Sequence, residues 1–238
     1  MPFVPVILSC PLFFLLLAGP AAPPPAAVHV VIDIERAYMG SVRKAQIEYW
    51  LAPDKTWVSQ RGRITVTRRD LGVRWRLDAA TKTFVEEKLK PPLAPGKPPA
   101  GDDIRSARFD YEPEFDWTVA QRGRTTVAGR ECREFSADGQ ADFARTSIRF
   151  AIGPRVALKI DPDVNLLLAG QAGNESVSRF LRDAARTRGN GCLMSYEETQ
   201  EPAIAPTIIQ RVTISTLELV PPPAGVFDIP DGFTKASK

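Results

Sequence analysis

Apolar and polar residues alternate along most of the chain after residue 27, and this pattern restricts the fold to a sheet-based architecture. The clearest example is Val73–Leu77, where Arg74 and Arg76 separate three apolar residues. Successive side chains of a strand point to opposite faces, so this segment has one buried face and one charged face. Segments of similar character lie at 28–39, 42–51, 56–60, 64–67, 81–88, 116–119, 125–127, 130–135, 146–152, 192–199 and 207–220. We therefore expect a mainly β domain.

One stretch has helical periodicity instead. Apolar residues recur at the spacing of a single helix face from Val177 to Ala185, with Asn174 before them and Gly189 after them. Asparagine is a favoured N-cap and glycine a favoured stop, so these residues predict the ends of a helix. A shorter helix is expected at 164–169. The fold class is therefore α+β, with a helical insert near 160–188.

The opening of the chain is typical of a secretory signal. Residues 1–32 contain no Lys, Arg, Asp or Glu, and an apolar block at 6–18 precedes a run of small residues and prolines at 19–27. This order predicts a signal peptide at 1–27 and an exported protein, periplasmic or extracellular. An uncleaved membrane anchor and lipidation at Cys10 are the alternatives.

The remainder, 28–238, is expected to form a single domain. Its Pro-rich segment at 91–101 cannot join a helix or a central strand, so we interpret it as a loop within that domain. The whole chain is 44% hydrophobic and 25% charged, which is ordinary for a globular protein. A net charge of +3 gives no support for nucleic-acid binding, which requires a concentrated basic surface.

Arginines are concentrated between residues 61 and 76. We expect Arg63, Arg74 and Arg76 to share a charged sheet face. Such a face is either an ordinary solvated surface or an interaction face for anionic lipid headgroups or an acidic partner.

Cys132 and Cys192 form an even pair once the leader is set aside. In an oxidising compartment such a pair predicts a disulfide, and two buried free thiols are the alternative. Neither cysteine belongs to a Cys-x-x-Cys pair, so zinc binding and redox catalysis are not expected.

The sequence gives no set of catalytic residues. His29 is the single histidine, and no Gly-x-Ser-x-Gly motif accompanies it. Adjacent carboxylates such as Glu197 and Glu198 should point to opposite faces of their strand, so they cannot act together. We therefore expect no enzyme activity, no metal and no cofactor.

The four tryptophans lie at positions 50, 57, 75 and 117. Core packing is the simplest role for them. A second hypothesis is that Trp50, Trp57, Trp75 and Phe84 line a site for an apolar ligand, because β structures with aromatic interiors hold such ligands.

Several segments, taken in order, resemble exported bacterial proteins with the fold of outer-membrane lipoprotein carriers, the LolA/LolB-like superfamily. The segments that carry the resemblance are Tyr49–Lys55, Asp70–Asp78, Thr81–Glu86, Val127–Phe135 and Gly225–Phe233. The resemblance implies a curled antiparallel sheet that forms an incomplete barrel, with helices over its open side. It also implies an apolar cavity between them, which shelters acyl chains in the carriers.

These observations together predict an exported, non-enzymatic binding protein that holds a lipid or other apolar ligand in a half-barrel. The alternative is an envelope module for protein interaction or sensing, in which the Arg-rich face binds a protein or a membrane surface. Nucleic acid is not an expected partner.

Overall fold

The computed structural model describes residues 27–89, 113–158, 160 and 162–236. The predicted signal peptide, apart from Ala27, and the Pro-rich segment at 91–101 lie outside these residues. Ala27 itself begins the first strand. The strands are β1 (Ala27–Tyr38), β2 (Ser41–Ala52), β3 (Lys55–Gln60), β4 (Arg63–Arg68), β5 (Val73–Asp78), β6 (Thr83–Lys88), β7 (Asp116–Val127), β8 (Arg130–Ala141), β9 (Ala144–Gly153), β10 (Cys192–Pro202), β11 (Ile208–Val220) and β12 (Thr234–Lys235).

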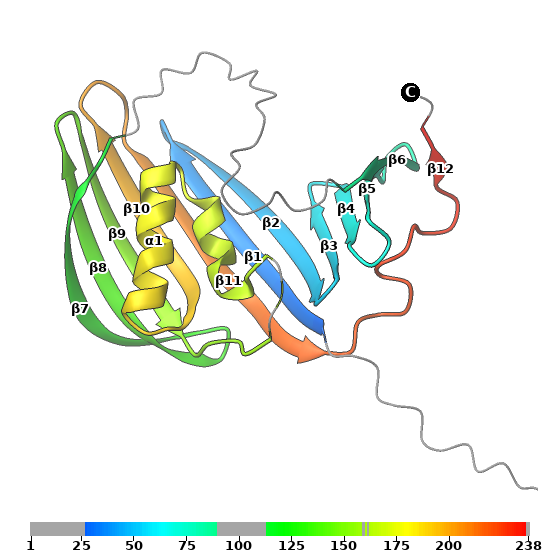
Figure 1. Cartoon of the computed structure of the whole chain (residues 1–238). Helices are drawn as coiled ribbons and strands as arrows, with labels where there is room; N and C mark the ends of the chain where they lie inside the picture. The colour runs from blue at the N-terminus through cyan, green and yellow to red at the C-terminus, as the bar shows by residue number, and fades with distance from the viewer. Residues whose placement is uncertain (1–26, 90–112, 159, 161, 237–238) are drawn as a thin grey trace, which may run out of the picture.

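All of these strands belong to one sheet in the order β12-β6-β5-β4-β3-β2-β1-β11-β10-β9-β8-β7. Neighbours pair antiparallel except for β12, which pairs parallel with β6. The central contact joins β1 to β11, so the first and the last long strands lie side by side (Figure 1). The sheet curls without closing, which confirms the predicted incomplete barrel.

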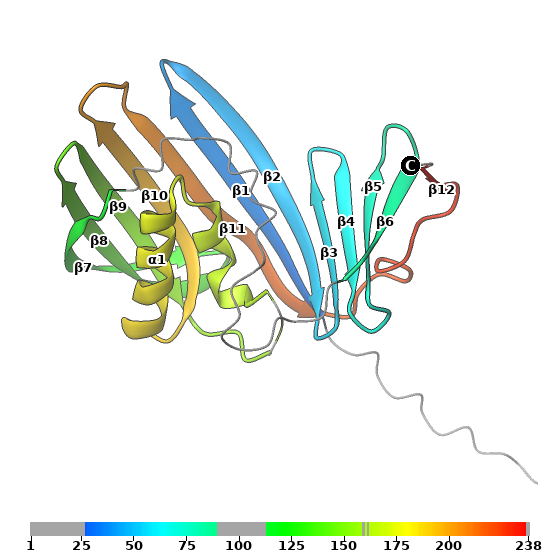
Figure 2. The same ribbon diagram turned by 45° about the horizontal axis from the view of Figure 1, so that its top comes forward.

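The helical insert lies between β9 and β10. It consists of the 3₁₀ helix η1 (Val164–Gln171) and the α-helix α1 (Glu175–Thr187). Asn174 caps α1, because its side-chain oxygen accepts a 2.8 Å hydrogen bond from the Val177 N–H. Both helices lie on the concave side of the curled sheet (Figures 1 and 2), as the resemblance noted in the sequence implied.

The main hydrophobic core fills the space between the concave face and these helices. The largest fully buried side chains of this core include Ile32, Ile148, Phe150, Leu168, Leu181 and Tyr196. Burial of these side chains is the main force that holds the insert on the sheet.

A second hydrophobic cluster lies on the opposite, outer face. Along β2, Leu51 belongs to the main core, whereas its neighbours Trp50 and Ala52 belong to the second cluster. This follows from strand alternation, which sends adjacent side chains to opposite faces. The sheet is therefore covered on both faces at β2.

The chain after β11 covers this second cluster. Phe227 is 9% exposed and packs among the outer-face residues. The Arg68 guanidinium donates a 2.7 Å hydrogen bond to the Asp228 carboxylate and also contacts the Phe227 carbonyl. Residues 221–236, called the C-terminal segment below, therefore pack across the outer face and end as β12.

Candidate functional site

The concave face of the sheet is the candidate site, because it is the surface that the curl of the sheet encloses. The helical cover, which is η1 together with α1, contributes apolar side chains that are completely buried against this face. On the cover these are Val164, Leu168, Ala169, Val177, Leu181 and Ala185. The facing surface of the sheet is aliphatic and aromatic, so the packed contact between the sheet and the cover is apolar.

A polar cluster interrupts this apolar surface on β10 and β11. Gln200 donates a hydrogen bond of 2.5 Å to the Glu198 carboxylate. Gln210 donates hydrogen bonds to the Tyr196 hydroxyl at 2.9 Å and to the Gln171 carbonyl at 2.5 Å. Because Gln171 ends η1, this cluster joins the cover to the sheet through hydrogen bonds.

Glu198 is the buried carboxyl of the cluster, with an exposed fraction of 1%. Burial raises the pKa of Glu198, because the charged carboxylate loses its hydration, and the hydrogen bond from Gln200 opposes this shift. The neutral carboxyl is thus favoured on the concave face relative to an ordinary glutamate. A neutral carboxyl can both donate and accept a hydrogen bond.

The link between η1 and α1 approaches this carboxyl closely. The N–H of Gly173 lies 3.4 Å from Oε2 of Glu198. A Cβ atom at Gly173 would lie 2.7 Å from the Gln200 side-chain nitrogen, so a larger residue there would make the Gln200 amide shift. The link between the two helices therefore lies directly against the polar cluster.

The adjacent carboxylates of β10 behave as strand alternation predicts. Glu198 faces the core, whereas Glu197 lies on the outer face, where Arg211 forms an ion pair with it. The sequence indicated that the two would diverge, but it gave no sign of which one would be buried. Tyr196 and Gln200, at alternate positions with Glu198, were the available signal for a polar stripe.

Aromatic rings join the free edge of the cover to the edge of the sheet. Trp117 on β7 stacks on Phe180 of α1, with ring centroids 4.1 Å apart. Phe180 also meets Phe150 of β9 edge to face at 5.8 Å. A depression of about 340 Å³ lies beside this stack, and its lining includes Phe115 and Arg179.

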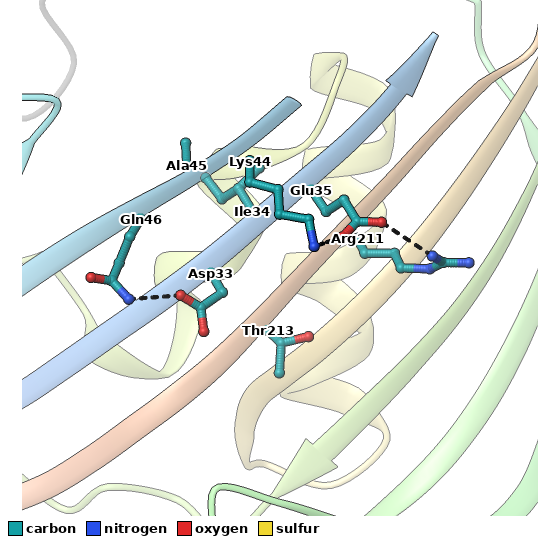
Figure 3. A pocket seen from close by; sticks show the side chains of 8 residues that line it. All are labelled: Asp33, Ile34, Glu35, Lys44, Ala45, Gln46, Arg211 and Thr213. Atoms are coloured by element: carbon teal, nitrogen blue, oxygen red, sulfur yellow. Dashed lines mark hydrogen bonds and ion pairs between the residues drawn. The ribbon is translucent and has the colours of Figure 1, made fainter. Parts of the chain in front are cut away.

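A larger depression, of about 590 Å³, lies on the outer face over β1, β2 and β11 (Figure 3). Glu35 lies between two cations there, 3.1 Å from Lys44 and 3.4 Å from Arg211. The hydrogen bond from Lys44 lowers the pKa of Glu35. Gln46 donates a 2.9 Å hydrogen bond to Asp33. These charges satisfy one another, so the depression is a cross-strand polar network open to solvent.

The aromatic residues predicted to line a ligand site lie together, but on the outer face. Trp50 and Trp75 are each 9% exposed, and Trp57 and Phe84 pack against the same cluster. The C-terminal segment covers them through Phe227. They therefore act as a packed second core in this structure, because strand alternation places them opposite the concave face.

The three arginines predicted to share a face lie on the same face of the sheet. Cross-strand pairing places Arg74 opposite Thr67 and Arg76 opposite Thr65, so both arginines lie on the same side of the sheet as Arg63. Arg76 forms a 3.2 Å ion pair with Glu87. Asp78 pairs with Arg63 in register, so acidic residues accompany the arginines on this face.

The predicted disulfide is not present, since Cys132 and Cys192 are buried free thiols. Cys192 pairs with Gly153 on β9, and the Cys132 sulfur lies close to Gly153 from the other side. Two strand spacings amount to about 10 Å, whereas a disulfide needs Cα atoms closer than about 7 Å. Burial raises the pKa of Cys192 to about 12.

His29 lies on the outer face. Its ring stacks on Trp50 with centroids 4.2 Å apart, and its Nε2 atom lies 2.9 Å from the Glu48 carboxylate. No group of three or more potential metal ligands occurs within the described residues. Among the helices that the structure describes, none has the length and hydrophobicity to cross a membrane.

Comparison with known proteins gives structural matches at low identity. No family model matches the chain, and no curated protein matches it in sequence. The chain is similar to a LolA superfamily protein from Nitrosomonas europaea, with 11% identity over 87% of this chain and 91% of that chain and a TM-score of 0.29. It is also similar to a DUF1329 family protein from Desulfovibrio piger, with 9% identity over 86% and 90% of the two chains and a TM-score of 0.27.

A third match is to PNGF-II, with 10% identity and a TM-score of 0.33. It covers 90% of this chain and 31% of the PNGF-II chain, so this chain spans less than a third of that protein. TM-scores this low carry no argument about family, activity or ligand.

Proposed function

We propose that this protein is an exported, non-enzymatic binding protein that holds a lipid or another apolar ligand on the concave face of its half-barrel. The observation that carries this proposal is the pairing of a curled apolar sheet face with a helical cover formed by one continuous insert. The ligand would lie between the two and replace part of the contact that they make with each other. The four aromatic residues of the outer face are not part of this site.

The way in which the cover is attached supports this proposal. At the link between η1 and α1, Gln210 donates a hydrogen bond to the Gln171 carbonyl and Glu198 accepts one from the Gly173 N–H. The apolar contacts of the cover are those that an acyl chain could take over, since dispersion and hydrophobic burial are not directional. A shift of the insert between its two connections to β9 and β10 would open the face without unfolding the sheet.

The polar cluster gives the proposed ligand an amphiphilic character. The side chains of Glu198, Gln200 and Gln210 offer hydrogen-bonding atoms to an ester, hydroxyl or carboxyl group, while the surrounding side chains accept hydrocarbon. A fatty acid or a lipid with a small polar end fits this combination better than a pure hydrocarbon does, because its polar end can exchange hydrogen bonds with this internally paired cluster.

A quenching experiment tests where the ligand binds. Brominated fatty acids quench only those tryptophans that they contact, and Trp117 borders the concave site whereas Trp50 and Trp75 lie on the outer face. We expect saturable quenching of the full-length protein that disappears in Trp117→Phe and persists in Trp75→Phe. Quenching that depends on Trp75 and not on Trp117 would instead place the ligand in the outer cluster, and an absence of quenching would refute the proposal.

A further inference from the structure

Three loop tips at one end of the sheet carry exposed apolar side chains. Met39, in the β1–β2 turn, is 71% exposed, Phe143 in the β8–β9 turn is 68% exposed, and Ile204 in the β10–β11 loop is 100% exposed. Beside Met39, Tyr38 is 42% exposed and Val42 is 55% exposed. We call these five residues the apolar rim.

The rim residues lie along one continuous edge of the half-barrel. The strand order β2-β1-β11-β10-β9-β8 places the three tips in succession at the same end (Figures 1 and 2). The Ala203 N–H donates a 3.0 Å hydrogen bond to the Phe143 carbonyl, which joins two of the tips directly. At the third tip, Tyr38 pairs with Ile208, the first residue of β11.

The side chain at the β1–β2 tip is unusual for its position. Met39 and Gly40 have φ values of 49° and 74°, a turn geometry in which Asn-Gly or Asp-Gly is the favoured pair. A methionine there adds no turn stability and presents apolar surface to water. Single exposed apolar residues are common, but a row of them across three adjacent tips marks an interaction surface.

Positive charge lies directly behind this apolar surface. The segment 36–44 contains Arg36, Arg43 and Lys44 and no acidic residue. Lys44 pairs with Glu35, which leaves the two arginines to supply most of the charge near Met39. Asp142 and Glu201 flank the other two tips, so the positive charge is concentrated at the β1–β2 tip.

We propose that the apolar rim docks on an anionic lipid bilayer, with Met39, Ile204 and their neighbours in the interfacial region and Arg36 and Arg43 against the headgroups. Apolar tips backed by arginine fit such a surface, because apolar burial and attraction to anionic lipid add together. The charge at the β1–β2 tip makes a bilayer a better fit than an uncharged apolar partner. This docking does not depend on the ligand proposed for the concave face.

A vesicle flotation experiment with the full-length protein tests the proposal. The vesicles are phosphatidylcholine alone or phosphatidylcholine mixed with phosphatidylglycerol. The rim variant is Met39→Asn with Ile204→Asn, and asparagine suits the positive φ of residue 39. The control variant is Leu71→Asn with Leu219→Asn. It removes two exposed leucines, 56% and 59% exposed, from the opposite end of the sheet.

We expect the wild-type protein to float with the anionic vesicles and the rim variant to bind them about tenfold or more weakly, as follows from two apolar side chains left in water. The control variant should bind like the wild type, and Arg43→Glu should weaken binding in low salt. Failure of the wild type to float with either vesicle would overturn the proposal. Equal binding by the rim and control variants would overturn it as well.

Discussion

Trp117 of β7 and Phe180 of α1 stack face to face with ring centroids 4.1 Å apart, and this contact joins the helical cover to the edge of the sheet. Gly139 lies beneath the same indole, where a Cβ atom would be 2.7 Å from Cζ3 of Trp117. The ring is therefore held between the backbone of β8 and the phenyl ring of the helix. The edge of the proposed ligand site depends on this arrangement.

Removal of the phenyl ring should loosen the cover. We expect Phe180→Ala to lower the unfolding free energy by about 2 kcal/mol, since the side chain is partly buried and contacts two rings. It should also speed the release of a bound fatty acid. Urea unfolding and stopped-flow release measure the two effects. Phe180→Leu should preserve most of the stability, and a change below about 0.5 kcal/mol in Phe180→Ala would contradict this role.

A side chain at position 139 should displace Trp117. We expect Gly139→Ala to cost about 1–3 kcal/mol, because the added methyl group would overlap the indole. Gly170→Ala in η1 is the matched control, since a Cβ atom there meets nothing within 4 Å. Thermal unfolding of the two variants compares them directly. Equal midpoints would show that Trp117 does not rest on Gly139.

Glu198 should make stability depend on pH in a defined direction. The pKa of Glu198 is raised in the folded state, so the folded protein holds this proton more tightly than the unfolded chain does. The unfolding free energy should therefore fall as the pH rises from the usual glutamate pKa of 4.5 through the raised pKa. Glu198→Gln should reduce that fall, and Glu197→Gln on the other face should not. Denaturant titrations across this pH range measure the slope. An unchanged slope in Glu198→Gln would refute the assignment.

The C-terminal segment should shield the outer aromatic cluster. We expect Phe227→Ala to cost about 2–4 kcal/mol and to increase acrylamide quenching of Trp50 and Trp75, because Phe227 is 9% exposed and packs in the same cluster. Fatty-acid binding should be unchanged, since the proposed site lies on the other face. Loss of that binding would show that the outer cluster is the site after all.

Local periodicity predicted the elements of this fold well. The alternation at Val73–Leu77 gave β5 with its two faces, and the apolar spacing around Val177 gave α1 with Asn174 as its cap. Such patterns report which side chains share a face, and that information is contained in a few consecutive residues. The prediction that the sheet forms an incomplete barrel came from the resemblance noted in the sequence and not from local periodicity.

The position of the candidate site could not be predicted in the same way. Alternation placed Trp50, Trp57 and Trp75 on faces without showing that the distant C-terminal segment would cover them. The burial of Glu198 in place of Glu197 likewise depends on which side the helical cover occupies. The spacing of Cys132 and Cys192 along the chain says nothing of the strand that separates them. Each of these facts is set by contacts between distant segments.

Native mass spectrometry of the protein purified from its exported form tests the central claim most directly. The account predicts adducts of several hundred daltons that disappear when the same sample is denatured, since the ligand would be held by apolar contacts on the concave face. A native mass equal to that of the polypeptide alone, in preparations that also fail to take up added fatty acid, would contradict the claim.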